Sequence, residues 1–282
     1  MSVTQAEQPL LELKGLAVDF ATDDGTVYAV DGIDLALARG RTLGLVGESG
    51  CGKSVTSLAI MGLLPPENSK VRGEVWFEGR NLLTLGANAL RDLRGARLAM
   101  IFQEPMTSLN PSYTIGDQII EAIRRHQGLD SAAARARAIE VLKLVRIPSP
   151  EKRVDDYPHK LSGGMRQRAA LARTLAVEPT VLLMDEPFSA LDAQTKMVLQ
   201  QDLAETLAEE NKTALFITHD LAEAVALSDR ILVMSARPGT IVEEIRVDLP
   251  GRANPMQRRR SPRVGEYLAR LMELLHVEER AL

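Results

Sequence analysis

The hydrophobic positions of the chain follow two patterns, which together predict an α/β fold. Near the N-terminus, residues 10–20 and 26–30 alternate between apolar and polar on either side of Asp23-Asp24-Gly25, and residues 33–37 alternate again. A period of two with a Gly-containing break predicts a β-hairpin, so we expect an antiparallel β subdomain here. Later runs are short and wholly apolar, as expected of buried strands: 43–46, 181–184, 214–217 and 231–234.

Apolar residues recur at helical spacing in the segments between these strands. The longest such block covers 115–145 and breaks near Gly128-Leu129-Asp130, where Ser131 is a candidate N-cap of a second helix. Strands that alternate with helices predict a mostly parallel sheet, and the long block predicts an inserted α-helical subdomain at about residues 104–165. At the C-terminal end we expect a helix over 264–276.

The composition disfavours several functional classes. Of 282 residues, 45% are hydrophobic and 26% are charged, and the formal net charge is −4. That charge gives no field to attract a nucleic-acid backbone, so we expect no nucleic-acid partner. No apolar run approaches the roughly 18 residues that cross a bilayer, and no signal peptide is recognisable, which predicts a cytoplasmic location. We expect Arg258-Arg259-Arg260 to be a solvated linker, with binding to anionic headgroups as the weaker alternative.

The stretch Gly47-Glu48-Ser49-Gly50-Cys51-Gly52-Lys53-Ser54 matches the phosphate-binding pattern G-x-x-x-x-G-K-[ST] without a mismatch. It lies between a predicted strand and a predicted helix that begins near Val55, which is the context that the motif requires. The glycines let successive N–H groups turn toward phosphate oxygens, and the helix adds the positive end of its dipole. Lys53 is expected to reach the β- and γ-phosphates and Ser54 to bind Mg²⁺.

Cys51 is the only cysteine, which excludes an intrachain disulfide and a multi-cysteine metal site. Because it lies in the phosphate loop beside Lys53 and a helix N-terminus, we expect its thiol pKa to be lowered. A thiol alkylator should then block ATP hydrolysis, and bound ATP should protect the thiol.

Polar residues follow three other predicted strands. Asp185 and Glu186 come after the run 181–184, where Asp185 could hold Mg²⁺ and Glu186 could face the water that attacks the γ-phosphate. Gln103 follows a strand at 98–102, and His219 follows the run 214–217. Open α/β sheets present ligand-binding groups at strand C-termini, so we expect these residues to converge on one nucleotide.

Ser162-Gly163-Gly164 precedes a helix with no strand before it, so it is not a second phosphate loop. Ser162 as an N-cap, followed by exposed N–H groups, could form an anion site at a helix N-terminus. The segment read alone is equally compatible with a plain capped helix.

Six motifs, in this order and approximate spacing, resemble those of the nucleotide-binding subunit of ABC transporters: the phosphate loop, Gln103, Leu161-Ser-Gly-Gly-Met165, Leu182-Leu-Met-Asp-Glu-Pro187, Ser189-Ala-Leu-Asp192 and His219. They are similar to the Walker A, Q-loop, signature, Walker B, D-loop and H-loop motifs. The resemblance implies a P-loop NTPase (RecA-like) core. It implies a cassette over residues 8–240 and a C-terminal extension over 241–282.

The resemblance further implies a head-to-tail dimer of cassettes with two ATP molecules between them. In such a dimer Glu186 would be the catalytic base and His219 would contact the γ-phosphate. Gln103 would touch Mg²⁺ and the attacking water. The segment 162–164 would serve the nucleotide on the opposite cassette, and Asp192 would touch the facing subunit. For the aromatic residue that stacks on adenine, Phe20 and Tyr28 both qualify, with a slight preference for Tyr28.

The front half resembles dipeptide, oligopeptide and nickel importer ATPases, whereas the segments 185–195 and 233–239 are more similar to nitrate, sulfonate and taurine importer ATPases. The loop 103–111, where the family contacts its membrane subunit, favours a peptide-type importer. Implied partners are membrane permease subunits and, indirectly, an extracytoplasmic solute-binding protein, which would place the chain peripherally on the cytoplasmic face of the inner membrane. Alternatives are an anion importer, a soluble ABC ATPase acting on nucleic acid or ribosomes, and a non-hydrolysing regulatory cassette.

Overall fold

The computed structural model describes residues 8–103, 109–189 and 191–276. Strands β1, β2, β4 and β5 form an antiparallel sheet in the order β2-β1-β4-β5, as the hairpin pattern predicts. Their bounds are β1 Leu11–Thr22, β2 Gly25–Leu37, β4 Ser69–Phe77 and β5 Arg80–Asn81. The segments 26–30 and 33–37 belong to one strand, β2, and β1 lies between β2 and β4.

A second sheet of six strands has the order β10-β9-β3-β8-β7-β6. All neighbouring pairs are parallel except β10 with β9, so the prediction of a mostly parallel sheet is confirmed. The strands are β3 Thr42–Gly47, β6 Leu98–Ile101, β7 Val181–Asp185, β8 Thr213–Ile217, β9 Arg230–Met234 and β10 Ile241–Arg246.

Successive residues of the central strands pack into two different cores, which explains why these strands are apolar throughout. In β7, Leu183 belongs to the core shared with the antiparallel sheet, whereas Met184 belongs to the core shared with the helical group. In β8, Ile217 and Phe216 divide in the same way. A parallel sheet covered on both faces leaves no position for a polar side chain except at strand ends.

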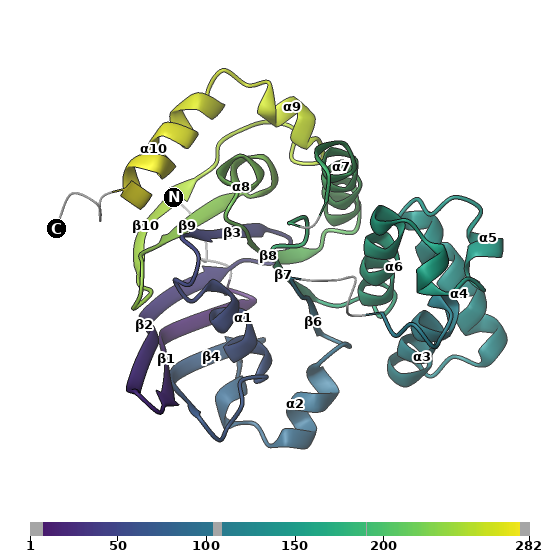
Figure 1. Ribbon diagram of the computed structural model, residues 1–282, viewed down its shortest axis with the longest axis horizontal. Coiled ribbons are helices and arrows are strands. Elements are labelled where there is room, and N and C mark those ends of the chain that lie inside the picture. Colours follow the sequence, from purple (N-terminus) through teal and green to yellow (C-terminus); the bar gives the residue numbers. More distant parts are fainter. Residues whose placement is uncertain (1–7, 104–108, 190, 277–282) are drawn as a thin grey trace, which may run out of the picture.

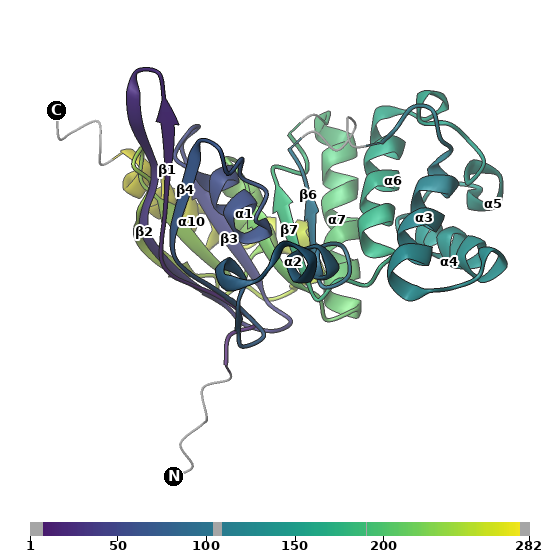
Figure 2. The ribbon, with the colours of Figure 1, turned by 90° about the horizontal axis from the view of Figure 1, so that it is seen from below.

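The helices cover both faces of this sheet and form a separate group at one side. Figure 1 shows α1 near the antiparallel sheet, α7 and α8 on the other face, and α3–α6 grouped beyond β6 and β7. The bounds are α1 Lys53–Met61, η1 Leu82–Thr84, α2 Ala87–Leu93, α3 Ile115–Gln127, α4 Ser131–Leu144, α5 Pro150–Arg153, η2 Pro158–Lys160, α6 Gly163–Leu175, α7 Ala193–Glu209 and α8 Leu221–Leu227. Figure 2 shows the same separation of the helical group from a perpendicular direction.

The break within the helical block is where the sequence predicts it, but its N-cap is different. α4 is capped by Asp130, whose carboxylate accepts a hydrogen bond from the Ala133 N–H at 2.9 Å. The expectation for Ser131 is therefore wrong, since Ser131 is the first residue within the helix. Both residue types suit an N-cap, and Gly128, which ends α3 in the left-handed conformation, leaves Asp130 at the capping position.

Residues 241–276 pack onto the α/β core rather than extending from it. β10 pairs with β9, so the division expected between residues 240 and 241 falls within a hairpin of the sheet. α9 Pro255–Arg259 contacts α7 and α8, and α10 Val264–His276 contacts α8 and β9. Arg258 is 2% exposed, so the expectation of a solvated linker is wrong at this residue.

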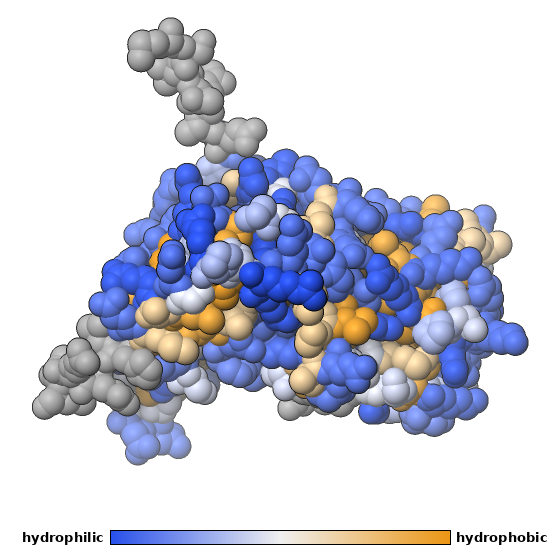
Figure 3. All heavy atoms as spheres, turned by 90° about the horizontal axis from the view of Figure 1, so that it is seen from above, coloured by the Kyte–Doolittle hydropathy of each residue, from blue (hydrophilic) through white to orange (hydrophobic). Residues whose placement is uncertain are grey.

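The surface of the described residues is mostly hydrophilic on the face drawn in Figure 3, with small hydrophobic areas between charged ones. Among these residues, no helix combines the length and the hydropathy needed to span a bilayer.

Candidate active site

The phosphate loop lies at the C-terminal end of β3, whose six residues are all buried. Gly50 and Gly52 adopt φ values of 80° and 100°, a conformation that favours glycine. A Cβ atom on Gly52 would lie 2.6 Å from the Ala29 carbonyl oxygen of the hairpin, so a side chain does not fit there. The loop thus has the left-handed turns and the close packing that let its N–H groups face one side before α1 begins.

Lys53 is 5% exposed and curves back over this loop. Its ammonium group donates hydrogen bonds to the carbonyl oxygens of Gly47 at 2.8 Å and Glu48 at 2.7 Å. A buried ammonium needs such partners, because the desolvation of an unpaired charge costs several kcal/mol. The loop therefore fixes a positive charge beside its own backbone N–H groups.

Asp185, the last residue of β7, brings a carboxylate to the start of α1. Its Oδ1 accepts a hydrogen bond from the Ser54 hydroxyl at 3.0 Å, and the residue is 4% exposed. Burial raises the pKa of the Asp185 carboxyl, and the charge of Glu186 raises it further, whereas Ser54 and Lys53 act in the opposite direction. The Ser54 hydroxyl and the Asp185 carboxylate, with the charge of Glu186 nearby, are oxygen ligands suited to a hard divalent cation.

Three side chains from three neighbouring strand ends meet at Glu186. Its Oε2 accepts a hydrogen bond from Gln103 Nε2 at 3.2 Å and lies 3.1 Å from Nδ1 of His219. Gln103 follows β6, Glu186 follows β7 and His219 follows β8, strands that are adjacent in the sheet. The structure thus brings together the groups that the sequence places after separate strands.

The backbone of Glu186 adopts the left-handed conformation, which is uncommon for a residue other than glycine. Its φ is 47°, and its N–H donates to the Ile217 carbonyl at 2.9 Å. A non-glycine residue in the left-handed region costs of order 1–3 kcal/mol, and such residues cluster at active sites. Here the turn directs the carboxylate, which is 15% exposed, toward Gln103 and His219.

Ser162 caps α6, as predicted, and accepts a hydrogen bond from the Met165 N–H at 3.3 Å. The helix begins with Gly163 and Gly164, and a Cβ on Gly164 would lie 2.7 Å from a methyl group of Thr195 on α7. A hollow of about 430 Å³ lies at this end of α6, lined in part by Ser162, Gly163, Gly164 and Asp192. Figures 1 and 2 both show α6 apart from α1, with β6 and β7 between them.

Asp192 borders this hollow and caps α7. Its Oδ1 accepts hydrogen bonds from the N–H groups of Gln194 at 3.1 Å and Thr195 at 3.0 Å. Hydrogen bonds from Thr195 hold the pKa of the Asp192 carboxyl below its ordinary value. The caps of α6 and α7 thus lie side by side on one surface.

The expectation for Cys51 is wrong. Burial raises the pKa of its thiol, and the charge and hydrogen bonds of Lys53 offset only part of that increase. The side chain is 1% exposed and lies among apolar residues between the loop and the hairpin, while Lys53 Nζ is 3.6 Å from its sulfur. Position in a phosphate loop did not reveal that the thiol points into the core.

The two candidate aromatic residues lie on opposite faces of the β1–β2 hairpin. Tyr28 pairs with Asp19, is 55% exposed and lines a hollow with Asp19 and Lys70. Phe20 is next to Asp19 on the strand, so it faces the other way, and it packs against the core that contains Cys51 of the phosphate loop. The structure thus places Phe20, not Tyr28, on the face that packs against this core.

Some contacts with the site come from residues that the sequence patterns did not single out. Arg237, after β9, donates a hydrogen bond to the Gly50 carbonyl at 3.3 Å, and Gly239 packs directly against the Cys51 backbone. Buried Glu223 of α8 accepts a hydrogen bond from Thr218, the residue before His219, at 2.6 Å. For Glu223, the sequence signal that was available is a charged residue within the otherwise apolar helix Leu221–Leu227. Residues 104–108 of the loop expected to contact a membrane subunit lie outside the described residues.

Comparison with known proteins agrees with this geometry. A family model described as "ABC transporter" matches residues 30–189, more than half of the chain. The chain belongs to the ABC transporter family. This assignment supports the resemblance read from the six motifs.

Relatives of this ABC cassette include peptide transport proteins. It is 46% identical over 240 residues to "Oligopeptide transport ATP-binding protein OppD" of Bacillus subtilis. The aligned region covers 85% of this chain and 66% of that relative. The cassette is 48% identical over 235 residues to "Dipeptide transport ATP-binding protein DppD" of Haemophilus influenzae, covering 83% and 71%. The matched region thus spans about two thirds of the length of these relatives.

Solved structures of another ABC cassette share its fold. The dimeric structure of MJ0796, described as a bacterial ABC transporter cassette, superposes with a TM-score of 0.73 at 28% identity and covers 84% of this chain and 98% of that one. A second dimeric structure of MJ0796, in a post-hydrolysis state bound to ADP and Pi, matches equally well. The predicted fold class, a P-loop NTPase core with an antiparallel β subdomain, is confirmed.

Proposed function

We propose that this cassette hydrolyses ATP to drive an importer for peptides or a related small solute. The observation that supports it most is the convergence of Gln103, Glu186 and His219 beside the pair formed by Ser54 and Asp185. These groups surround the end of the phosphate loop, where the terminal phosphate of a bound nucleotide would lie.

Each group has a distinct role in the proposed hydrolysis. The loop N–H groups and Lys53 bind the β- and γ-phosphates. Glu186 accepts a proton from the attacking water, which Gln103 helps to orient. His219 contacts the γ-phosphate, and its contact with Glu186 keeps both groups on the same side of the nucleotide. Phe20 stacks on the adenine.

The oxygen ligands fit Mg²⁺. The Ser54 hydroxyl and the Asp185 carboxylate lie 3.0 Å apart and would hold the ion together with the phosphates and water, and Gln103 would also touch it. When bound, the ion neutralises charge on the β- and γ-phosphates. The raised pKa of Asp185 follows from burial and negative charge that such an ion would offset.

The site is completed by a second cassette. Ser162 and the N–H groups after it suit a phosphate, yet α6 lies away from α1 in the same chain. The dimeric structures of MJ0796 support the pairing of two cassettes. In the proposed pair, each chain presents α6 to the nucleotide of the other. Asp192, beside Ser162, then contacts the facing subunit.

The cassette dimer acts on membrane permease subunits from the cytoplasmic face of the inner membrane, and a solute-binding protein delivers the solute from outside. Support for peptides comes from the relatives, whose names specify oligopeptide or dipeptide transport. The anion-type resemblance of the segments 185–195 and 233–239 makes sulfonates or nitrate the alternative cargo.

Uptake by cells tests the proposal. A strain that lacks this chain, restored with either the wild type or Lys53→Ala, is supplied with labelled dipeptide and labelled taurine in parallel. We expect wild type alone to restore dipeptide uptake and a polytopic membrane protein to co-purify with it. Taurine uptake restored in its place would support the alternative, and co-purification with nucleic acid would contradict the transporter assignment.

A further inference from the structure

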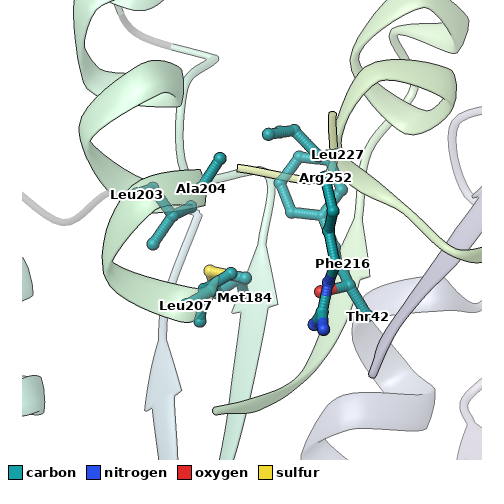
Figure 4. A pocket seen from close by; sticks show the side chains of 8 residues that line it. All are labelled: Thr42, Met184, Leu203, Ala204, Leu207, Phe216, Leu227 and Arg252. Atoms are coloured by element: carbon teal, nitrogen blue, oxygen red, sulfur yellow. The ribbon is translucent and has the colours of Figure 1, made fainter. Parts of the chain in front are cut away.

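Residues 252–259 help to hold α8, the helix that follows His219, at both of its ends. Figure 1 shows α9 packed over α7 and α8. Figure 4 shows Arg252, just before α9, extending alongside Phe216 toward Thr42. The Arg252 Nε also lies 3.4 Å from a carboxylate oxygen of Asp229. These contacts anchor the chain that leads into α9.

The C-terminal end of α8 is bound by Arg258. Its guanidinium donates hydrogen bonds to the carbonyl oxygens of Ser228 at 2.8 Å and Ala226 at 3.4 Å. These carbonyls lie at the helix end, where a positive charge also interacts favourably with the helix dipole. α9 therefore fixes one end of a helix that is only seven residues long.

The N-terminal end of α8 is held by buried Glu223, which is 3% exposed. Its carboxylate accepts hydrogen bonds from Gln200 Nε2 at 2.9 Å and from the Thr218 hydroxyl at 2.6 Å, and it forms an ion pair with Lys196 at 2.5 Å. A carboxylate this deeply buried requires several hydrogen-bond donors, because the loss of any one of them leaves its desolvation less well compensated.

Arg259 holds the carbonyl end of the Gln200 amide, and Glu223 accepts from the opposite, NH₂ end. The Arg259 guanidinium donates to Gln200 Oε1, so the amide NH₂ is directed at the carboxylate. Gln200 is fully buried, and the reversed amide would point an oxygen at a carboxylate oxygen. Arg259 thereby stabilises the orientation in which Gln200 is a donor.

Thr218 passes this restraint to His219. Its hydroxyl donates to Glu223 and accepts a hydrogen bond from the Asp220 N–H at 3.0 Å, so it connects the residues on either side of His219. Asp220 is held in turn by Lys196 at 2.8 Å and caps α8. The His219 side chain is 60% exposed and lies 3.1 Å from Glu186, so its position depends on the backbone that carries it.

We propose that Arg259 is a positioning residue for ATP hydrolysis, acting through Gln200, Glu223 and Thr218 on His219. We call this series the polar relay. The inference rests on the proposed function, since it assigns the relay to His219 of that site. Loss of Arg259 leaves the buried Gln200 carbonyl oxygen without its hydrogen-bond donor, which weakens the hold of Gln200 on Glu223 and loosens the backbone around His219. The phosphate loop and Phe20 are untouched, so turnover should fall while ATP binding is preserved.

Steady-state ATP hydrolysis by the full chain tests this. Arg259→Ala should lower kcat about threefold to tenfold, the range expected for a residue that acts through such a network, with KM for ATP within about twofold. Arg259→Lys, which keeps a donor, should recover most of kcat. The matched control is Arg260→Ala, which removes an exposed arginine from the next position and should leave kcat unchanged.

A double substitution tests the route. Gln200→Met keeps the length of the side chain but removes both polar ends, so Arg259→Ala should have no further effect on kcat in that background. If the two substitutions instead lower kcat by the product of their separate effects, the polar relay is wrong. Equal kcat values for Arg259→Ala, Arg260→Ala and wild type, in a preparation where His219→Ala abolishes turnover, would also overturn it. Arg259→Met, which keeps the aliphatic stem, replaces Arg259→Ala if the latter does not fold. Absence of hydrolysis by wild type would instead contradict the proposed function.

Discussion

Two parts of the molecule present groups suited to phosphate, and they differ in how complete they are. At the C-terminal edge of the parallel sheet, the phosphate loop lies beside Asp185, Glu186 and His219, so binding and chemistry share one place. At the start of α6, Ser162 caps a helix beside a hollow, far from those carboxylates in the fold. The contrast supports our proposal that α6 acts on a nucleotide held by another chain.

The largest effect is expected from replacing Glu186, the proposed general base at the edge of the parallel sheet. Glu186→Gln should lower turnover by about 10² to 10⁴, the contribution of a general base, while nucleotide binding is retained. Phosphate release measures turnover and equilibrium binding of a fluorescent ATP analogue measures affinity. Glu209→Gln on the exposed end of α7 is the control, and turnover unchanged by Glu186→Gln would remove Glu186 from this role.

Ser162→Arg addresses the second part. The added side chain would fill the hollow at the start of α6, so hydrolysis should fall about 10²-fold, as when a donor to the developing charge is lost. Nucleotide affinity of the separate chain should not change, because the phosphate loop is elsewhere. Ser131→Arg, at the exposed first residue of α4, is the matched control. A loss of affinity in Ser162→Arg would place the start of α6 in the same-chain site.

The hairpin beside the loop offers a smaller effect. Phe20→Ala should weaken ATP binding about tenfold, within the range measured for the loss of an aromatic stack on a base. Tyr28→Ala, on the opposite face, should change it by less than about twofold. Titration of both variants with the same ATP analogue compares them directly, and the reverse order would mean that Tyr28 contacts the adenine.

Cys51 provides the mildest test of the loop. Because burial raises its thiol pKa, iodoacetamide at pH 7.5 should modify it several-fold more slowly than free glutathione, which has an ordinary thiol. The rate should rise as the pH increases, since the thiolate fraction grows toward the raised pKa. Mass spectrometry over a time course measures the rate. Modification faster than glutathione would restore the expectation of an activated thiol.

Local patterns sufficed wherever the structure depends on adjacent residues. The strand, loop and helix around Lys53 could be predicted because glycine positions and a continuous apolar run act within about a dozen residues. The convergence on Glu186 also followed, because parallel strands present their ends at one edge. Ser162 as an N-cap needed only its own helix.

Predictions failed where distant segments decide the outcome. Arg258 was expected in solvent, yet it is buried because the carbonyls of α8, some 30 positions earlier, accept its hydrogen bonds. Cys51 was expected to be reactive, since the sequence does not show that the hairpin covers it. The faces of Phe20 and Tyr28 depend on the strand register, which a loose alternation leaves open.

The most direct test of the central claim, that the site is shared between two cassettes, is the mass of the chain with ATP. Light scattering of Glu186→Gln without nucleotide should give the monomer, 30.9 kDa, and with ATP it should give twice that mass. Adding Ser162→Arg should keep the ATP-bound chain at the monomer mass. A Glu186→Gln chain that binds one ATP per molecule and remains monomeric, while the wild type hydrolyses ATP at the same concentration, would contradict the account.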